Sequence, residues 1–300
     1  MFFSAYGLVI QSDFFLPELA LKSDNQCHPD IKIYQSKLQA PELHPTDSNI
    51  LSAISQDSAY LYWSEAGTIL VKEGKQIVVD PIDNFDEQIL RIFVLGAAFG
   101  LLLHQRGFMI LHGNSINIKG KGVCFIGNRG FGKSTISASL YFKGYPIVSD
   151  DVTAIKFENS QAYLVPGYGR IKLWTDSVEA LGLEAQNLPK VHPNFEKREY
   201  LINESLVTDL VPLKCVYILG GAEELTIESL SPSEALFKIM QNCYCTRFCK
   251  QMYNTLSAVE HFQQSSSLVK HTNVFALKRT NDLSSLAKLT ELIEEHIAKL

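Results

Sequence analysis

The sequence predicts a mixed α/β or α+β fold, with a small β-rich domain at residues 1–87 and a larger domain at residues 88–300. Two patterns carry this prediction. The first 87 residues consist mainly of short β-branched and aromatic runs separated by turn residues, as is typical of strands. In the rest of the chain, strand-like runs alternate with segments whose apolar residues recur at helical spacing. A chain of 300 residues accommodates one large or two modest domains.

The composition excludes several classes of protein. The chain is 46% hydrophobic and 20% charged, which is enough for a core and excludes wholesale disorder. Its net charge of −5 argues against nucleic acid as a partner. The longest apolar run, 92–103, is shorter than the roughly 20 residues that cross a membrane, and the first residues lack a signal-peptide pattern. Six cysteines are too few for a disulfide scaffold. We therefore expect a cytoplasmic protein with reduced thiols and no membrane partner, and homo-oligomer formation is left open.

In the β-rich domain the strands are expected at 4–12, 30–35, 59–64, 67–73 and 75–80, and the polar residues 36–57 are expected to form a loop. Residues 86–106 then carry apolar side chains on one broad helical stripe, and Gly107 ends the predicted helix. Gly96 and Gly100 lie four residues apart, so they would let another element approach this helix closely.

In the larger domain the predicted strands are 108–112, 115–119, 122–127, 145–151, 154–158, 162–166, 213–219 and 225–230. The predicted helices are 133–143, 175–182, 232–241, 244–259 and 283–299. Residues 184–212 are polar and poorly periodic.

Residues 127–134, GNRGFGKS, match the pattern G-x-x-x-x-G-K-[ST] between a predicted strand and a predicted helix. Its glycines let backbone N–H groups point at a phosphate, and the helix start adds a partial positive charge. Lys133 would reach the β- and γ-phosphates, and the Ser134 hydroxyl would ligate Mg²⁺. The cofactors expected are ATP and Mg²⁺. The predicted binding residues are Gly127, Asn128, Arg129, Gly130, Phe131, Gly132, Lys133, Ser134 and Thr135.

Two adjacent carboxylates, Asp150 and Asp151, end the next predicted strand, and 16 residues lie between Lys133 and Asp150. One carboxylate can hold Mg²⁺ together with Ser134, and the other can accept a proton from an attacking hydroxyl. We assign Asp150 to the metal and Asp151 to the base, and the order within the pair stays open. Two like charges so close should raise the pKa of one of them. His112 ends a strand and could hydrogen-bond an aspartate, although a lone histidine is more often structural.

Leu111-His112, the loop GNRGFGKST and the closely following Asp150-Asp151 together resemble the HPr kinase/phosphorylase superfamily, in particular its short HPr-kinase-like members. The segments LLLHQRG (101–107), PGYGRIKLW (166–174) and YGLVIQSDFFLPEL (6–19) look like that family too. The resemblance covers residues 1–20 and 88–175 and is thin over 184–300. Asn128-Arg129 and the Gly-Asn-Ser after His112 depart from the family pattern, and no equivalent of a phosphorylase loop is found.

The resemblance implies a P-loop nucleotide-binding core related to HPr kinase and phosphoenolpyruvate carboxykinase, and Mg-ATP-dependent transfer to a serine hydroxyl of a peptide or small protein. Some relatives look like peptide-tailoring kinases. Carried over, Lys133 and Ser134 bind phosphate and metal, Asp151 or Asp150 is the base, and His112 assists. Two alternatives remain: a kinase for a small metabolite such as a sugar or amino-acid derivative, and a regulatory module that senses ATP without transferring phosphate. The aspartate pair favours an enzyme.

Several other residues carry weaker predictions. Arg170 and Lys172 could neutralise phosphate charge or lie at a solvated strand edge, and Lys197-Arg198 read as surface residues. Cys243, Cys245 and Cys249 lack the spacing of a zinc site and are expected to be buried. Arg247 and Lys250 are expected on a solvent-exposed helix face, and His104 is expected to have a structural role.

Overall fold

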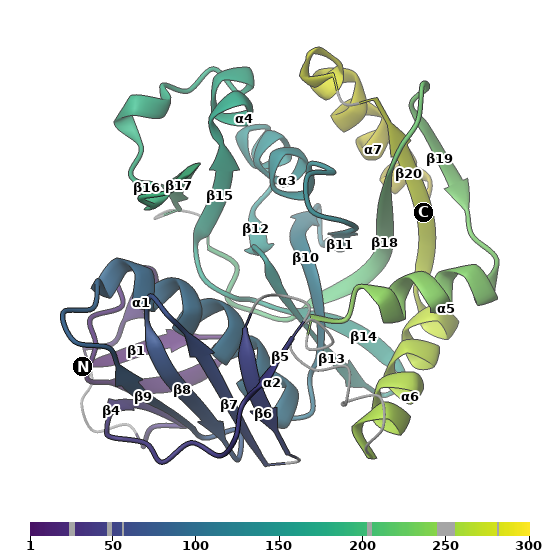
Figure 1. Cartoon of the computed structure of the whole chain (residues 1–300). Coiled ribbons are helices and arrows are strands. Elements are labelled where there is room, and N and C mark those ends of the chain that lie inside the picture. The colour runs from purple at the N-terminus through teal and green to yellow at the C-terminus, as the bar shows by residue number, and fades with distance from the viewer. Residues whose placement is uncertain (24–27, 47–49, 56, 203–205, 245–255, 281) are drawn as a thin grey trace. The chain divides into compact units, whose positions relative to one another are not determined.

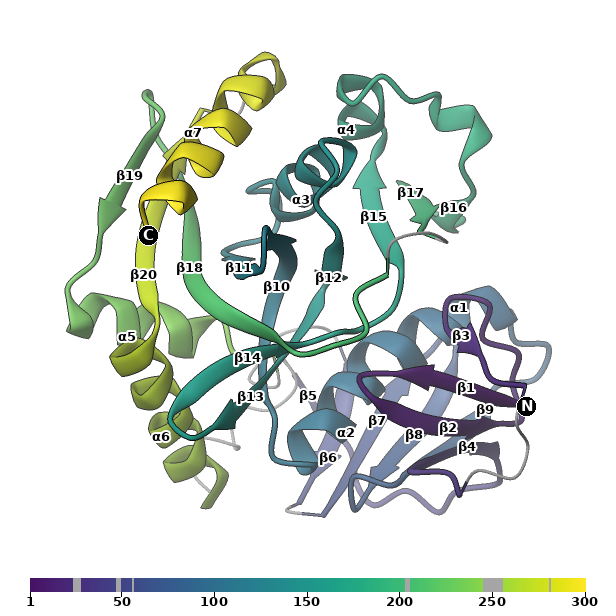
Figure 2. The same cartoon turned by 180° about the vertical axis from the view of Figure 1, so that it is seen from behind.

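The computed structural model describes residues 1–23, 28–46, 50–55, 57–202, 206–244, 256–280 and 282–300. It is a mixed α/β structure, as predicted, with three sheets among the described residues (Figures 1 and 2). The chain divides into two compact units. The first comprises residues 1–110 and 243–263, and the second comprises residues 111–242 and 264–300. The domain boundary expected at residues 87 and 88 stays a prediction.

The first unit is built on a nine-stranded sheet with the order β3-β1-β2-β4-β9-β8-β7-β6-β5. Four of its strands, β4, β7, β8 and β9, lie where the sequence predicts them. Strands β4 and β7 bury alternate side chains, whereas β8 and β9 each bury three consecutive residues. The strands are β1 (Phe2–Ala5), β2 (Leu8–Ser12), β3 (Ala20–Leu21), β4 (Ile31–Gln35), β5 (His44–Pro45), β6 (Leu51–Ile54), β7 (Ser58–Trp63), β8 (Gly67–Lys72) and β9 (Gln76–Pro81).

Two predictions for this sheet are wrong. Residues 4–12 do not form one strand, because Tyr6 and Gly7 adopt left-handed φ angles of 54° and 70° and turn the chain between β1 and β2. Residues 36–57 are not all loop, since the short strands β5 and β6 extend the sheet edge beyond β7. Strands of two to four residues are too short to show a period of two.

The helical stretch Glu87–Gln105 consists of α1 (Glu87–Phe93), a π-helical turn (Val94–Ala98) and α2 (Phe99–Gln105). Asp86 caps its start by accepting hydrogen bonds from the backbone N–H groups of residues 88 and 89. By length and composition this stretch could cross a membrane, but 61% of its most apolar window is buried, as in the core helix of a soluble protein.

Gly100 confirms the prediction of a close approach. A Cβ atom at Gly100 would lie 2.5 Å from the ring of Tyr244, which is itself buried in the same unit, whereas at Gly96 it would lie 3.5 Å from the Tyr244 hydroxyl.

The second unit contains an eight-stranded sheet in which long β18 (Val211–Gly221) pairs with both β14 (Gln161–Val165) and β11 (Lys121–Ile126). The strands β10 (Met109–Ile118) and β13 (Val152–Glu158) complete a closed circuit, β10-β13-β14-β18-β11. Outside the circuit, β12 (Ile147–Ser149) pairs with β10, β20 (Asn273–Arg279) pairs with β18, and β19 (Thr226–Ser229) pairs with β20.

Four strands of this sheet point the same way. Strands β18 and β20 are parallel to β11 through successive pairings, and β12 is parallel to β11 because both are antiparallel to β10. The carboxyl ends of parallel strands lie at one edge of a sheet, which is where open α/β sheets bind ligands. The segments that follow β11, β12, β18 and β20 therefore meet at this edge.

One face of the sheet is covered by α3 (Lys133–Phe142) and α7 (Leu286–Lys299). Their apolar side chains share a buried cluster with strand residues that include Phe125, Tyr217 and Leu277. Further elements of the unit are β15 (Arg170–Trp174), α4 (Thr175–Ala180), β16 (Lys190–His192), β17 (Phe195–Leu201) and α5 (Pro232–Gln241). Helix α6 (Leu256–His271) begins in the first unit and continues in the second from residue 264. Strands β15, β17 and β16 form a separate three-stranded sheet.

The second unit confirms the predicted helices at α3, α4, α5 and α7 and corrects four other assignments. Residues 108–112 and 115–119 belong to one strand, β10. The polar residues 184–212 contain β16 and β17. Strand β20 was not predicted, because a short apolar run does not distinguish a buried strand from a helix. Helix α6 continues to His271, beyond the predicted end at residue 259, while residues 245–255 lie outside the described residues.

We predict that Gly100→Ala destabilises the protein by about 1–3 kcal/mol, since the added methyl group overlaps the buried ring of Tyr244. The matched control is Gly96→Ala in the same helical stretch, where the methyl group makes an ordinary contact and alanine is the better helix former. Urea denaturation followed by circular dichroism measures both. Equal midpoints for Gly100→Ala and the wild type would contradict the close packing.

Candidate functional site

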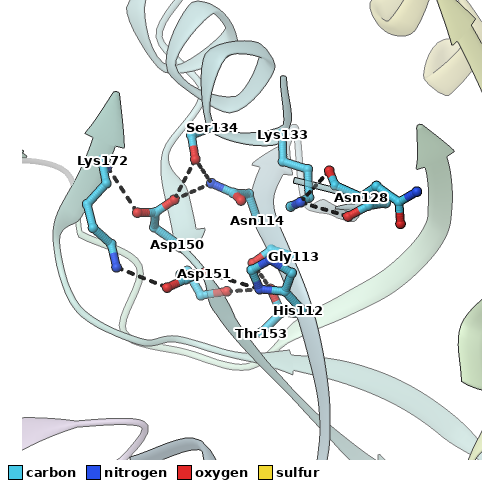
Figure 3. A network of polar contacts seen from close by, with 12 residues as sticks. His112, Gly113, Asn114, Asn128, Lys133, Ser134, Asp150, Asp151, Thr153 and Lys172 are labelled. Carbon is cyan, nitrogen blue, oxygen red and sulfur yellow. Dashed lines mark hydrogen bonds and ion pairs between the residues drawn. The ribbon is translucent and has the colours of Figure 1, made fainter. Parts of the chain in front are cut away.

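The side chains singled out in the second unit gather at the shared carboxyl edge of its parallel strands (Figure 3). The glycine loop follows β11, and the aspartate pair follows β12. Strand β10 runs between them in the opposite direction, so its first half, with His112 and Asn114, lies at the same edge. Residues separated by up to 39 positions in the chain, from His112 to Asp151, are thereby brought together.

The loop from Gly127 to Gly132 depends on glycine at three positions. Gly127, Gly130 and Gly132 have φ angles of 145°, 89° and 85°, a region that side chains rarely allow. A Cβ atom on Gly127 would also lie 3.0 Å from the carbonyl oxygen of Leu219 on β18. Gly132 is the N-cap of α3, and no side chain caps this helix start. Free N–H groups at the start of a helix are an anion-binding arrangement.

Lys133 is the first residue of α3, and its ammonium group curls back over the loop. It donates hydrogen bonds to the backbone carbonyl oxygens of Gly127 at 2.7 Å and Asn128 at 3.1 Å (Figure 3). The lysine is buried, so these carbonyl groups compensate part of the cost of its burial. The ammonium group is thus held beside the helix start, where a bound phosphate would meet both.

Ser134, Asp150 and Asn114 form a second cluster next to the loop (Figure 3). The Ser134 hydroxyl donates to Asp150 Oδ1 at 3.3 Å, and the Asn114 amide donates to the same carboxylate oxygen and to Ser134 Oγ. Asp150 Oδ2 accepts the backbone N–H of Lys172 at 3.0 Å. Both oxygens of this carboxylate are therefore oriented by neighbours on three different elements.

Asp150 is only 7% exposed, and its electrostatics follow from this burial. Burial raises the pKa of Asp150, and the neighbouring charge of Asp151 adds to the rise. The positive charges of Lys172, Lys197 and Arg170 oppose it without reversing the direction. The pair thus contains one carboxylate of raised pKa, as the sequence analysis expected. That carboxylate is Asp150, which was assigned to the metal, rather than Asp151, which was assigned to the base.

Asp151 has the opposite environment. Its side chain is 30% exposed, and it lies between Lys172 Nζ, 3.0 Å from Oδ2, and His112 Nδ1, 3.1 Å from Oδ1 (Figure 3). Burial alone would raise the pKa of Asp151, but Lys172 and His112 outweigh it and hold this pKa well below its usual range. Asp151 adopts a left-handed φ of 70°, so the turn sends its carboxylate in a different direction from that of Asp150.

Backbone and hydroxyl groups hold the turn that carries the two aspartates. The N–H of Val152 donates to the carbonyl of Asp150, and Thr153 Oγ1 donates to the carbonyl of Gly113 at 2.9 Å. The sequence pattern does not identify Asn114, because it predicts two separate strands at 108–112 and 115–119 with Asn114 between them. In one continuous strand, His112 and Asn114 share a face, and the period of two would have identified Asn114.

The basic residues of β15 are not at a solvated edge, which corrects one of the two readings of Arg170 and Lys172. Both are buried, and Arg170 forms an ion pair with Glu199 of β17 at 3.0 Å. Lys172 supplies a backbone N–H to one aspartate and its ammonium group to the other. Lys172 is therefore part of the aspartate cluster.

Lys197 and Arg198 are half-buried rather than fully exposed, and they use opposite faces of β17. Lys197 lies over the ring of Trp174, with its Nζ atom 5.6 Å from the ring centroid. Arg129 of the glycine loop approaches the same ring, with its Cζ atom 5.8 Å from the centroid. Arg198 instead bonds to Glu196 and to the carbonyl of Leu188.

Other predicted residues take structural positions. Thr135 is buried, and its hydroxyl forms a hydrogen bond with that of Ser177 on α4. His104 stacks on His261 within the first unit, and burial lowers the pKa of each ring. Cys243 is buried, as expected, whereas Cys245, Cys249, Arg247 and Lys250 lie outside the described residues.

The oxygen atoms at the Ser134–Asp150 contact fit a magnesium ion. Mg²⁺ prefers oxygen ligands and is commonly held by one or two protein oxygens together with substrate phosphates and water. Ser134 Oγ and Asp150 Oδ1 are such a pair, 3.3 Å apart. Within the part of the chain that the structure describes, no group of three or more His, Cys, Asp or Glu side chains could hold a metal ion.

Comparisons with known proteins find similarity to solved structures only. No protein-family model and no curated protein matches the chain. Among solved structures, the HPr(Ser) kinase/phosphatase from Coxiella burnetii matches with 16% sequence identity and a TM-score of 0.33, covering 63% of this chain and 97% of that chain. A likeness at this level says nothing about activity, so the function has to be inferred from the side chains of the site.

We predict that Lys172→Met lowers the free energy of unfolding by about 1.5–3 kcal/mol at pH 7, the usual contribution of a hydrogen bond to a charged group. The folded-state pKa of Asp151 is lowered, so its stabilising contribution is present above the ordinary value of 3.8 and is lost as the pH falls through the folded value. The difference in free energy of unfolding between Lys172→Met and the wild type should therefore become smaller at acidic pH.

Urea denaturation at pH 7 and at the lowest pH at which both proteins fold measures this difference. The matched control is Lys156→Met on β13, which removes an exposed ion pair with Glu158 and should cost at most about 1 kcal/mol. An equal loss for Lys172→Met at both pH values would contradict the assigned pairing.

Proposed function

We propose that this protein is a Mg-ATP-dependent kinase of the HPr-kinase-like serine kinase type, which transfers the γ-phosphate to the hydroxyl group of a serine in a peptide or small protein. One observation carries the proposal. An anion-binding loop with a buried lysine, an oxygen pair suited to Mg²⁺ and a separate, partly exposed carboxylate lie together at one sheet edge. Kinases that transfer a phosphoryl group to a hydroxyl use these three parts.

In this proposal the loop amides and Lys133 bind the phosphates, while Ser134 and Asp150 hold Mg²⁺, which neutralises charge on the transferring group. The acceptor hydroxyl attacks the γ-phosphorus, its O–P bond forms as the bond to the ADP oxygen breaks, and its proton passes to the Asp151 carboxylate. The lowered pKa of Asp151 keeps this carboxylate ionised, but it also makes Asp151 a weaker base than an ordinary carboxylate, so the proposed role rests on its position. His112 and Lys172 are positioning residues that hold it in place.

The acceptor would approach from the side of β15 and β17, where Trp174 and Lys197 flank the Arg129 end of the loop. A cation and an aromatic ring beside the aspartates suit a peptide or a polar metabolite. We place the enzyme in the cytoplasm, without nucleic-acid or membrane partners. The P-loop relationship to phosphoenolpyruvate carboxykinase is part of the same proposal.

Two alternatives make different predictions. A small-metabolite kinase would phosphorylate a sugar or amino-acid derivative and no peptide, whereas an ATP-sensing module would bind ATP and transfer nothing. The contacts of Asp151 favour an enzyme, since an ATP sensor needs no ionised carboxylate held apart from the metal pair. Incubation with labelled ATP and separate peptide and metabolite panels distinguishes the three.

We predict that ATP with Mg²⁺ stabilises the folded protein by about 2.7 kcal/mol at 100 times Kd. Lys133→Ala should remove most of this gain, because it deletes the cation at the loop. Lys143→Ala, which removes a lysine paired with Glu294 at the other end of α3, is the matched control and should keep the gain. Thermal denaturation with and without Mg-ATP measures all three proteins, and an unshifted wild type would exclude ATP binding.

We predict that Asp151→Asn binds Mg-ATP like the wild type but transfers phosphate about 10²–10⁴-fold more slowly, the usual loss on removing a general base. Asp150→Asn should instead raise the Mg²⁺ concentration needed for half-maximal activity, since this variant loses a metal ligand. Steady-state kinetics with varied Mg²⁺ separates the two effects. If Asp150→Asn lost transfer and Asp151→Asn needed more Mg²⁺, the roles of the two aspartates would be reversed. If both variants kept full activity, the catalytic assignment would be wrong.

A further inference from the structure

Arg279 lies at the glycine loop, although it comes almost 150 residues later in the chain. It is the last residue of β20, which runs parallel to β18 with Arg279 opposite Gly221. Because β18 is parallel to β11, the end of β20 lies at the same sheet edge as the loop. The guanidinium Cζ, Nη1 and Nη2 atoms all lie 3.2 Å from the position that a Cβ atom on Gly132 would take.

This contact gives a second reason for glycine at position 132. The three guanidinium atoms are equally distant from the Cβ position, so the flat face of the group lies against the Gly132 backbone. A side chain at Gly132 would push the guanidinium group away, and it would also be strained at a φ of 85°. The bare backbone at the N-cap of α3 therefore brings a second cation to the helix start.

The charge of Arg279 is not compensated by the residues around it. The side chain is only 4% exposed, and its buried Nε and Nη1 atoms have no hydrogen-bond partner. No ion pair among the described residues includes it. Burial lowers the pKa of Arg279, but a guanidinium group stays protonated in proteins. A buried cation without a partner is costly, and such groups are normally paired.

The surroundings add positive charge rather than remove it. The N-terminus of α3 carries a partial positive charge, and no side chain caps it with a hydrogen bond. The ammonium group of Lys133, next to Gly132, donates to the carbonyl oxygens of Gly127 and Asn128. Arg279, Lys133 and a positive helix end thus lie together at the loop, whereas Asp150 and Asp151 interact with Lys172, Ser134 and His112.

We propose that Arg279 is a phosphate-binding residue of the glycine loop, which with Lys133 holds the phosphate chain of a nucleoside triphosphate. This inference rests on the proposed binding of ATP, but it does not depend on phosphate transfer. The Nε and Nη1 atoms of Arg279, which have no hydrogen-bond partner in the structure, would donate to phosphate oxygens. The planar guanidinium group of arginine is well suited to this, because it can donate two parallel hydrogen bonds. The bound anion supplies the charge that the folded chain lacks there.

A purely structural arginine predicts a different result, and this difference provides the test. If Arg279 stabilised the unliganded fold, removing it would lower the melting temperature without ligand. If its charge is compensated only by a bound phosphate, Arg279→Met removes an uncompensated buried charge from the unliganded protein. The melting temperature without ligand should then stay the same or rise, while the affinity for ATP falls. Arg279→Lys keeps the charge, loses the fork and should bind ATP with intermediate affinity.

Isothermal titration calorimetry with ATP and thermal denaturation without ligand test the full chain. Relative to the wild type, Arg279→Met should bind ATP about 10- to 100-fold more weakly, the equivalent of hydrogen bonds to a charged group. Lys143→Met, which removes a cation from the opposite end of α3, should bind ATP normally. If the methionine variant does not fold, Arg279→Lys alone should show weaker binding at an unchanged melting temperature.

The proposal would be overturned if Arg279→Met bound ATP within twofold of the wild type. It would also be overturned if the melting temperature of unliganded Arg279→Met were several degrees below that of the wild type. If Arg279→Met does not fold, the same two outcomes for Arg279→Lys would overturn it. A wild-type protein that binds ATP and transfers nothing, with weaker binding by Arg279→Met, would reject the kinase and keep Arg279. If the wild type transfers phosphate and Arg279→Met binds ATP as well as the wild type, the kinase is kept and the role of Arg279 is rejected. A wild type that binds no ATP would reject both.

Discussion

The strand directions in the second unit are the constraint on which the candidate site depends. Because β11, β12, β18 and β20 are parallel, the residues that follow or end them share one edge of the sheet. The antiparallel strand β10 brings His112 and Asn114 to that edge from the other direction. No local propensity of these residues would bring them together. A change in the direction of any one strand would move its polar residues to the opposite edge.

Charge is distributed at this edge in a way that suits transfer of an anion. The carboxylates of Asp150 and Asp151 are held apart by the backbone turn, one buried with a raised pKa and one partly exposed with a lowered pKa. The cations that hold them, such as Lys172, come from the separate sheet of β15. The glycine loop meanwhile has an excess of positive charge. A ligand with negative charge on its phosphates would balance the loop without disturbing the aspartates.

The parts of the site that the sequence predicted are those whose chemistry restricts the residue type. The loop needs glycine at positive φ, and a magnesium ion would need oxygen ligands such as Ser134 and Asp150, so both are visible as short patterns. The sequence did not predict Asn114, whose role depends on β10 being continuous. It named Lys172 as a phosphate-neutralising or solvated residue, but it did not predict the ion pair of Lys172 with Asp151. Strand β17 was missed because charged, half-buried residues obscure the alternation that marks a strand. Such information lies in tertiary contacts between distant segments.

The closed circuit of strands has a consequence for the order in which the protein can fold. Strand β11 pairs with β18 through residues about 90 positions apart, such as Gly122 and Leu213. Pairings this distant in sequence form slowly, because a long loop must be closed before they gain any contact energy. During synthesis on the ribosome, β11 therefore remains an open sheet edge until residues beyond 211 have emerged. A nascent chain that stalls before that point would expose the apolar strand next to its glycine loop to other chains.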